Sequence, residues 1–164
     1  DKDKVVEYAR LLFIDNFSRE QDYYKILKDN IPSDKWTEFV EDIIKEISEE
    51  NRHFSSYFIS DIYIKECWWD RLFEMVKKNP SLTNISQYEQ YLSKDYAVEI
   101  TELYEAEINK SLLRSADRNH YAEVCKYLRR MIKLGAREKV DSMIEKFRKE
   151  YARRPALLDE LKKV

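Results

Sequence analysis

The sequence has very little glycine and proline. Its 164 residues include one glycine, Gly135, and three prolines, whereas average usage near ~7% would supply about eleven glycines. Tight turns between short strands depend on these residues, so folds with many strands are excluded. Gly-rich phosphate-binding loops are excluded for the same reason. The composition therefore predicts an all-α fold.

Cysteine and histidine are equally scarce. The two cysteines, Cys67 and Cys125, lie far apart and have no cysteine or histidine at metal-ligand spacing. We expect both on apolar helical faces, where a free cysteine behaves as a small buried hydrophobic residue. His120 lies beside an expected helix start, where a solvated or capping role is ordinary. Neither a Glu-x-x-His nor a His-Glu-x-x-His pattern is formed by Glu7, Glu38, Glu41, Glu46 or Glu89. We therefore predict no metal, no cofactor and no enzymatic activity.

Long apolar runs are also missing. No run approaches the ~18 residues that a membrane-spanning helix needs, and no signal peptide is visible. We therefore expect a cytoplasmic protein with no membrane partner. The chain opens on Asp1, already in a helical pattern, which suggests a piece of a longer protein.

The sequence does contain apolar residues at helical spacing. Hydrophobic residues make up 43% and charged residues 38%, a balance typical of amphipathic helices. In the first helix Val5, Val6, Ala9, Leu12 and Phe13 recur at that spacing. We expect nine or ten helices in a single domain, 1–164. Their approximate ranges are 4–16, 18–30, 33–48, 52–66, 68–78, 86–92, 95–115, 120–134, 137–151 and from 155 onward.

Several residues mark the expected helix ends. Ser18 and Asp117 have the character of N-caps. Gly135 suits the left-handed position that ends a helix, and Pro155 suits the first turn of the last helix.

One aromatic stretch lies near the middle of the chain. Residues 53–76 hold seven aromatic side chains, and rings of this size bury roughly 150–250 Å² each. We therefore expect this stretch to be central to the core and covered by neighbouring helices.

The last third of the chain has the spacing of a helical repeat. Tyr121 and Pro155 are 34 residues apart, which is the tetratricopeptide period. The W-x₂-L-G-x₂-Y pattern of that family is absent. The spacing favours a degenerate array of helical hairpins that forms a right-handed α–α superhelix.

Two stretches resemble a known family. They are IKECWWDRLFEMVKKNPSL and HYAEVCKYLRRMIKLGAREKVDSMIEKFRKEYARRPALLDELKKV, in which RRPALLDEL carries most weight. They are similar to the helical region near the C-terminus of bacterial SWIM zinc-finger proteins. The resemblance implies a segment downstream of a zinc finger, with a role in protein or nucleic-acid interaction. The zinc motif itself is absent, and neither Cys67 nor Cys125 fits it.

Basic residues gather toward the C-terminus. Residues 114–164 hold 15 Lys and Arg against 8 Asp and Glu, and such a surface can bind phosphates. The alternative is a solvated helix face that the acidic remainder of the chain neutralises. The densest stripe, which Arg153 and Arg154 could extend, comprises Lys126, Arg129, Arg130, Lys133 and Arg137.

Tyrosine is abundant, with twelve residues. Tyrosine is enriched at protein interfaces, and the alternative is a place in the core between helices. The candidate residues for a peptide groove are Tyr23, Tyr24, Tyr88, Tyr91 and Tyr104. These patterns predict a non-catalytic interaction or scaffolding module of a larger intracellular protein, with a protein partner. The second hypothesis is a nucleic-acid-contacting region beside a zinc finger outside this chain.

Overall fold

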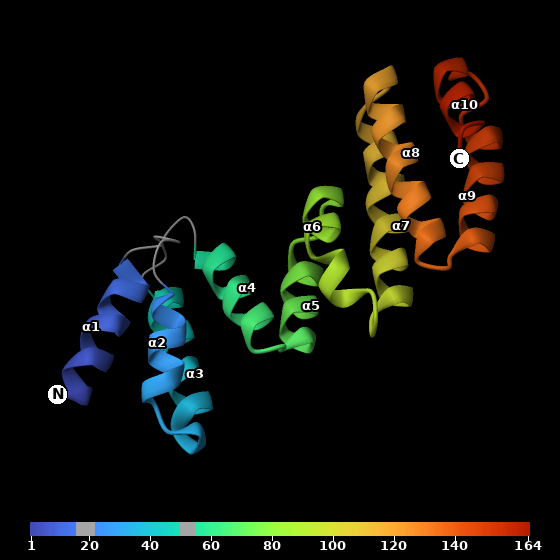
Figure 1. Ribbon diagram of the computed structural model, residues 1–164. Coiled ribbons are helices and arrows are strands. Elements are labelled where there is room, and N and C mark those ends of the chain that lie inside the picture. The colour runs from blue at the N-terminus through green and yellow to red at the C-terminus, as the bar shows by residue number, and fades with distance from the viewer. Residues whose placement is uncertain (16–21, 50–54) are drawn as a thin grey trace. The chain divides into compact units, whose positions relative to one another are not determined.

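The computed structural model describes residues 1–15, 22–49 and 55–164. All regular structure in these residues is helical and forms ten helices (Figure 1), which confirms the predicted all-α fold. The chain divides into two compact units, Asp1–Ile62 and Tyr63–Val164. The single domain over 1–164 and the right-handed superhelix remain predictions.

The first unit has an aromatic core. It contains α1 (Lys2–Asp15), α2 (Tyr23–Asn30), α3 (Ser33–Glu49) and the part of α4 (Ser55–Lys65) that ends at Ile62. α1 and α2 lie side by side (Figure 1). The ring of Phe13 lies 4.8 Å from that of Phe58 and 5.3 Å from that of Tyr24, and Tyr24 meets Trp36 edge-on at 5.3 Å. Such ring pairs add to the stability that burial provides.

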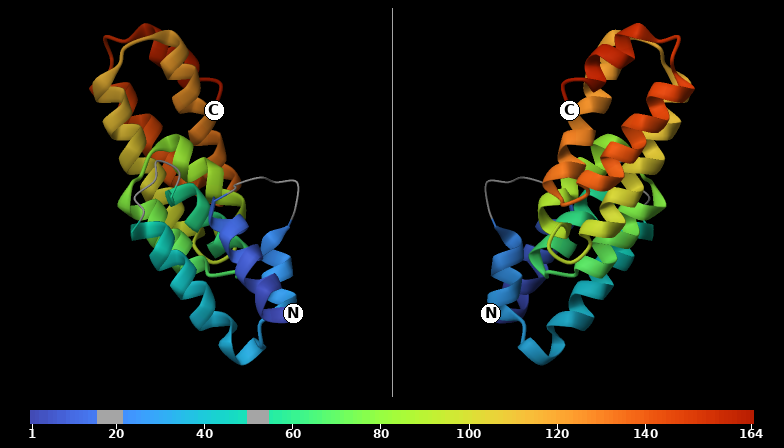
Figure 2. Two further views of the ribbon diagram at one scale, coloured as in Figure 1. Left: turned by 90° about the vertical axis from the view of Figure 1, so that its left-hand side faces the viewer. Right: turned by 90° about the vertical axis from the view of Figure 1, so that its right-hand side faces the viewer.

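The second unit is a series of antiparallel helices. It contains α5 (Trp69–Lys78), α6 (Leu82–Leu92), α7 (Ala97–Arg114), α8 (Arg118–Lys133), α9 (Arg137–Glu150) and α10 (Pro155–Leu161). α7, α8 and α9 lie side by side and alternate in direction, and α10 packs on α8 (Figures 1 and 2). The core runs through all of these helices. Its largest fully buried side chains include Tyr104, Tyr121 and Phe147.

Side-chain caps fix several helix starts. Asp117 caps α8 as expected, since its Oδ1 accepts a hydrogen bond from the N–H of Asn119 at 3.2 Å. The sixth helix was expected from residue 86 but begins at Leu82, because the Ser81 hydroxyl accepts from the N–H of Asn84 at 3.0 Å. The predicted cap Ser18 lies outside the described residues, and Asp22 caps α2.

Two helices end on a residue with left-handed backbone. Gly135 follows α8 with φ of 92°, as predicted, and the N–H of Ala136 bonds to the carbonyl of Met131 at 3.0 Å. Cys67 follows α4 with φ of 55°, and the N–H of Trp68 bonds to the carbonyl of Tyr63 at 2.8 Å. Both patterns are Schellman endings. The prediction of a buried, helical Cys67 is therefore wrong, because this residue is exposed in a turn.

The aromatic stretch is less covered than its sequence suggests. Among its described aromatic residues only Phe73 is buried, and Tyr57 is 41% exposed. The boundary between the two units falls inside the stretch, after Ile62. Because the rings are divided between two cores, the prediction of one central, covered segment is wrong.

Candidate interaction surfaces

An apolar surface lies on α1, in the first unit. Val5, Tyr8, Leu11 and Leu12 are 46%, 63%, 50% and 36% exposed; these four side chains are called the α1 face below. They are four of the nine large hydrophobic side chains that are exposed in the described part of the chain. At 100° per residue they lie within one side of the helix, and the buried Ala9 and Phe13 lie on the adjoining side, next to Val5 and Leu12. α1 is therefore apolar on both sides.

The sequence of α1 indicates this exposed surface, although the prediction of an ordinary amphipathic helix did not include it. Apolar residues in α1 occur at 5, 6, 8, 9 and 11–14 and so surround the helix. A helix that is apolar all round is normally covered on every side. Helical spacing places Val5 and Leu12 beside Ala9 and Phe13 and therefore predicts that all four are buried. In the structure Val5 and Leu12 are exposed.

The α1 face belongs to an acidic unit. Residues 1–62 carry 9 Lys and Arg against 15 Asp and Glu, a net charge of −6, whereas residues 63–164 carry 21 against 17, a net charge of +4. Within α1 the Arg10 guanidinium is paired with the Glu46 carboxylate at 2.6 Å. It also lies 5.6 Å from the centre of the Phe39 ring, so Arg10 serves the contact between α1 and α3.

Three of the five tyrosines expected in a peptide groove are buried. Tyr24, Tyr88 and Tyr104 are 4%, 5% and 0% exposed, so their rings cannot receive a peptide and the groove prediction is wrong for them. Tyr23 is half-buried, and Tyr91, at 36% exposed, stacks on Trp69 with the ring centres 6.1 Å apart. Tyr24, Tyr88 and Tyr104 form core contacts because each lies on the side of its helix that faces a neighbouring helix.

A partly buried polar network crosses three helices of the second unit. The Tyr104 hydroxyl on α7 donates to Glu89 Oε2 on α6 at 2.6 Å, and the Arg130 guanidinium on α8 donates to Glu89 Oε1 at 3.2 Å. Burial, reinforced by the adjacent carboxylate, raises the pKa of Tyr104 well above its usual value. The phenol thus remains a hydrogen-bond donor.

Most of the basic stripe is engaged with acidic neighbours. Lys126 pairs with Glu123, and Arg137 with Asp141 at 3.9 Å. With Arg130 held by Glu89, three of the five predicted contact residues are ion-paired. Arg129 is half-buried and Lys133 is exposed. The five residues lie along α8 and the start of α9, and their use as a nucleic-acid contact remains a prediction.

The two arginines that could extend the stripe differ in role. Arg153 is exposed. Arg154 donates from Nη1 to the carbonyl of Leu112 at 2.7 Å and lies 4.5 Å from the centre of the Tyr151 ring. His120 Nε2 lies 2.9 Å from the hydroxyl and 3.0 Å from the carbonyl oxygen of Ser111. Both side chains therefore contact the C-terminal end of α7, where Arg154 satisfies a carbonyl.

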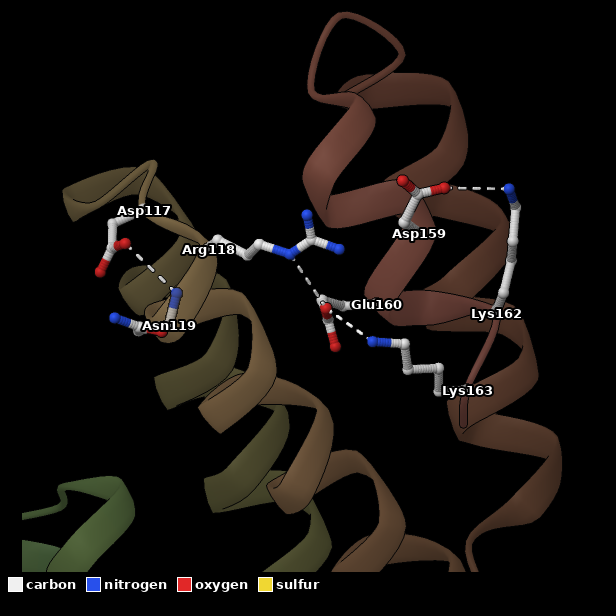
Figure 3. Close-up of polar contacts among 7 residues, drawn as sticks. All are labelled: Asp117, Arg118, Asn119, Asp159, Glu160, Lys162 and Lys163. Atoms are coloured by element: carbon white, nitrogen blue, oxygen red, sulfur yellow. Dashed lines mark hydrogen bonds and ion pairs between the residues drawn. The ribbon is translucent and has the colours of Figure 1, made fainter.

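A second polar cluster attaches the last helix to α8 (Figure 3). Glu160 on α10 is 7% exposed, and its Oε1 lies 2.8 Å from Lys163 Nζ and 3.5 Å from Arg118 Nε on α8. The hydrogen bond from Lys163 is the largest influence that lowers the pKa of Glu160, while burial opposes it. Lys162 likewise lowers the pKa of Asp159, which lies 3.0 Å from its Nζ. Every carboxylate in this cluster has a cation beside it, as expected of a structural contact.

A hollow of about 550 Å³ opens where α7 begins and α8 turns into α9. Its apolar lining includes Val98, which is 67% exposed, and its rim includes Arg137 and Lys139. Lys139 Nζ lies 2.8 Å from Glu105 Oε2, so this cation also has a carboxylate beside it.

The described residues contain no group of three or more His, Cys, Asp or Glu side chains arranged to hold a metal ion. Cys125 is buried, as predicted, and burial raises the pKa of its thiol to about 11. No described helix is both long enough and apolar enough to cross a bilayer.

Comparison with known proteins identifies no relative. No family model, no curated protein and no solved structure matches this chain.

Proposed function

We propose that this chain is a non-catalytic helical interaction module that binds a protein partner through the α1 face. The observation that carries the proposal is the exposure of Val5, Tyr8, Leu11 and Leu12 on one side of a helix whose adjoining side, with Ala9 and Phe13, is already buried. Contiguous exposed apolar residues are typical of protein contact sites, and scattered single ones are not. The four side chains lie within eight consecutive residues and therefore form one patch.

Capture of partners by matched variants tests this proposal. The first variant replaces Tyr8 and Leu11, the two most exposed members of the α1 face, with serine. The control replaces Val98 and Leu113, which are 67% and 74% exposed in the second unit, with serine. We expect proteins retained by the wild type and the control to be lost from the α1 variant. Identical sets of retained proteins on all three would contradict the proposal.

A second candidate function is contact with nucleic acid beside a zinc finger, in keeping with the resemblance to SWIM zinc-finger proteins. The net charge of +4 on residues 63–164 favours it, and the ion pairs of Lys126, Arg130 and Arg137 weaken it. Binding to labelled DNA and RNA at roughly 50 and 200 mM salt tests this candidate, because phosphate contacts weaken steeply with salt. We expect salt-sensitive binding that Lys133→Glu with Arg129→Glu abolishes. No binding at low salt would remove this candidate.

A further inference from the structure

We propose that the partner of the α1 face is a basic amphipathic helix. The inference rests on the proposed function and adds the chemistry of the partner. Two features of the first unit lead to it: the spacing of the apolar side chains on α1 and the charge around them.

The spacing of the α1 face suits another helix. Val5, Tyr8 and Leu12 are three and four residues apart, and Leu11 lies beside them. This is the 3–4 spacing of a seam between two packed helices. A partner with the same spacing on its own apolar side can place its side chains between these four, as amphipathic helices do when they bind helical surfaces.

The charge of the first unit indicates which charge a partner of the α1 face should carry. The unit has a net charge of −6. Asp3 and Glu7 of α1 are exposed, as is Asp1 just before the helix. Arg10, a cation of the same helix, is already bound to Glu46. Lys2 and Lys4 are exposed as well, and α1 itself has three basic and three acidic residues, so the net negative charge of the unit comes from residues outside α1. Lys and Arg beside the partner's apolar seam would complement the charge of this unit.

The same charge disfavours other occupants. A second copy would bring another unit of charge −6 against the first, and like charges opposite each other oppose binding. Anionic lipid headgroups would be repelled in the same way. The patch comprises four partly exposed side chains and is smaller than the ~800 Å² per partner of a standard interface. We therefore expect weak, reversible binding.

Designed peptides test the inference directly. The first probe is a helix about three heptads long with leucine at the seam positions and lysine elsewhere. The second replaces every lysine with glutamate, and the third scrambles the first so that composition and charge remain but the seam is lost. Binding of each to the whole chain is measured by fluorescence anisotropy.

We expect the basic helix to bind the wild type at least about tenfold more tightly than either other peptide. Tyr8→Ser with Leu11→Ser should remove that preference, whereas Val98→Ser with Leu113→Ser should retain it. Asp3→Asn with Glu7→Gln should weaken binding of the basic helix and leave the apolar contact in place.

Three results would overturn the inference, and they differ in what they mean for the proposed function. Preference for the acidic helix, lost in the α1 variant, would overturn the basic partner and leave the α1 face as an interaction surface. Concentration-dependent dimers that the α1 variant abolishes would likewise overturn the basic partner and leave the α1 face as an interaction surface. Equal binding of every peptide to the wild type and the α1 variant would overturn both the basic partner and the use of this face.

Discussion

The Tyr104 hydroxyl and the Glu89 carboxylate, 15 residues apart in sequence, lie 2.6 Å apart across the contact between α7 and α6. Arg130 of α8 binds the other oxygen of the same carboxylate at 3.2 Å. Glu89, whose side chain is 16% exposed, therefore connects three helices of the second unit. A cation and a phenol together satisfy a carboxylate that burial would otherwise destabilise.

Tyr104→Phe should lower the free energy of unfolding by about 1–2 kcal/mol, since it removes the donor to a largely buried carboxylate. The measurement is urea unfolding followed by circular dichroism. Tyr91→Phe is the matched control, because Tyr91 is partly exposed, and it should change stability by less than about 0.5 kcal/mol. Equal effects of the two changes would contradict a special role for the Tyr104 hydroxyl.

Replacing the left-handed residues should have opposite effects at the two Schellman endings. Cys67→Gly should stabilise the chain by up to about 1 kcal/mol, because glycine adopts positive φ without the penalty of a Cβ. Gly135→Ala should destabilise it by about 1 kcal/mol. No atom lies within 4 Å of the added carbon, so that cost is conformational. Cys67→Ala, which retains the Cβ, is the control for loss of the thiol, and stabilisation by alanine equal to that by glycine would contradict this explanation.

The two thiols should differ strongly in reactivity. Cys67 is exposed, whereas Cys125 is buried with its pKa raised to about 11, so little thiolate is present there at neutral pH. Iodoacetamide should label Cys67 in the folded chain, and both residues in denaturant. Mass spectrometry of the peptides measures each site. Rapid labelling of Cys125 in the folded chain would show that α8 opens readily.

The contact between α10 and α8 should weaken in acid. The pKa of Glu160 in the folded chain lies below its ordinary value of 4.5 because Lys163 and Arg118 favour the carboxylate. The Glu160 carboxylate therefore stabilises the folded chain fully at pH values above 4.5. This stabilisation is lost as the pH falls below 4.5 toward the pKa of Glu160 in the folded chain. The protection of the Leu157 and Leu161 amides from hydrogen exchange, corrected for the intrinsic exchange rate at each pH, should fall over this pH range in the wild type. Glu160→Gln should lower this protection at neutral pH and show a smaller change in protection with pH, and a change as large as in the wild type would contradict this role for Glu160.

Much of the fold could be predicted from short-range signals. The cap at Asp117, the stop at Gly135 and the start at Pro155 act within one helical turn, and the structure confirms all three. Cys67 was missed because its left-handed conformation has no glycine to mark it. Helical spacing alone also cannot show which side of α1 meets a neighbour, since apolar residues surround that helix.

The candidate sites were harder to predict because they depend on contacts between distant residues. The carboxylate that binds Arg130 lies 41 residues away in sequence, and no periodicity reveals that pair. Charge counts thus indicated a basic stripe but not the acidic partners of Lys126, Arg130 and Arg137. Tyr88 and Tyr104 suited an interface by residue type, yet their positions on α6 and α7 place them in the core.

Photo-crosslinking at position 8 tests the central claim most directly. Tyr8 is replaced by benzoylphenylalanine, an aromatic residue that suits an exposed site, and Leu113 is replaced in a control chain because it is 74% exposed outside the α1 face. Both chains are irradiated in cells that express the protein. We expect a discrete crosslinked partner from position 8 that position 113 does not give. No product at position 8, or the same products from both positions, would contradict it.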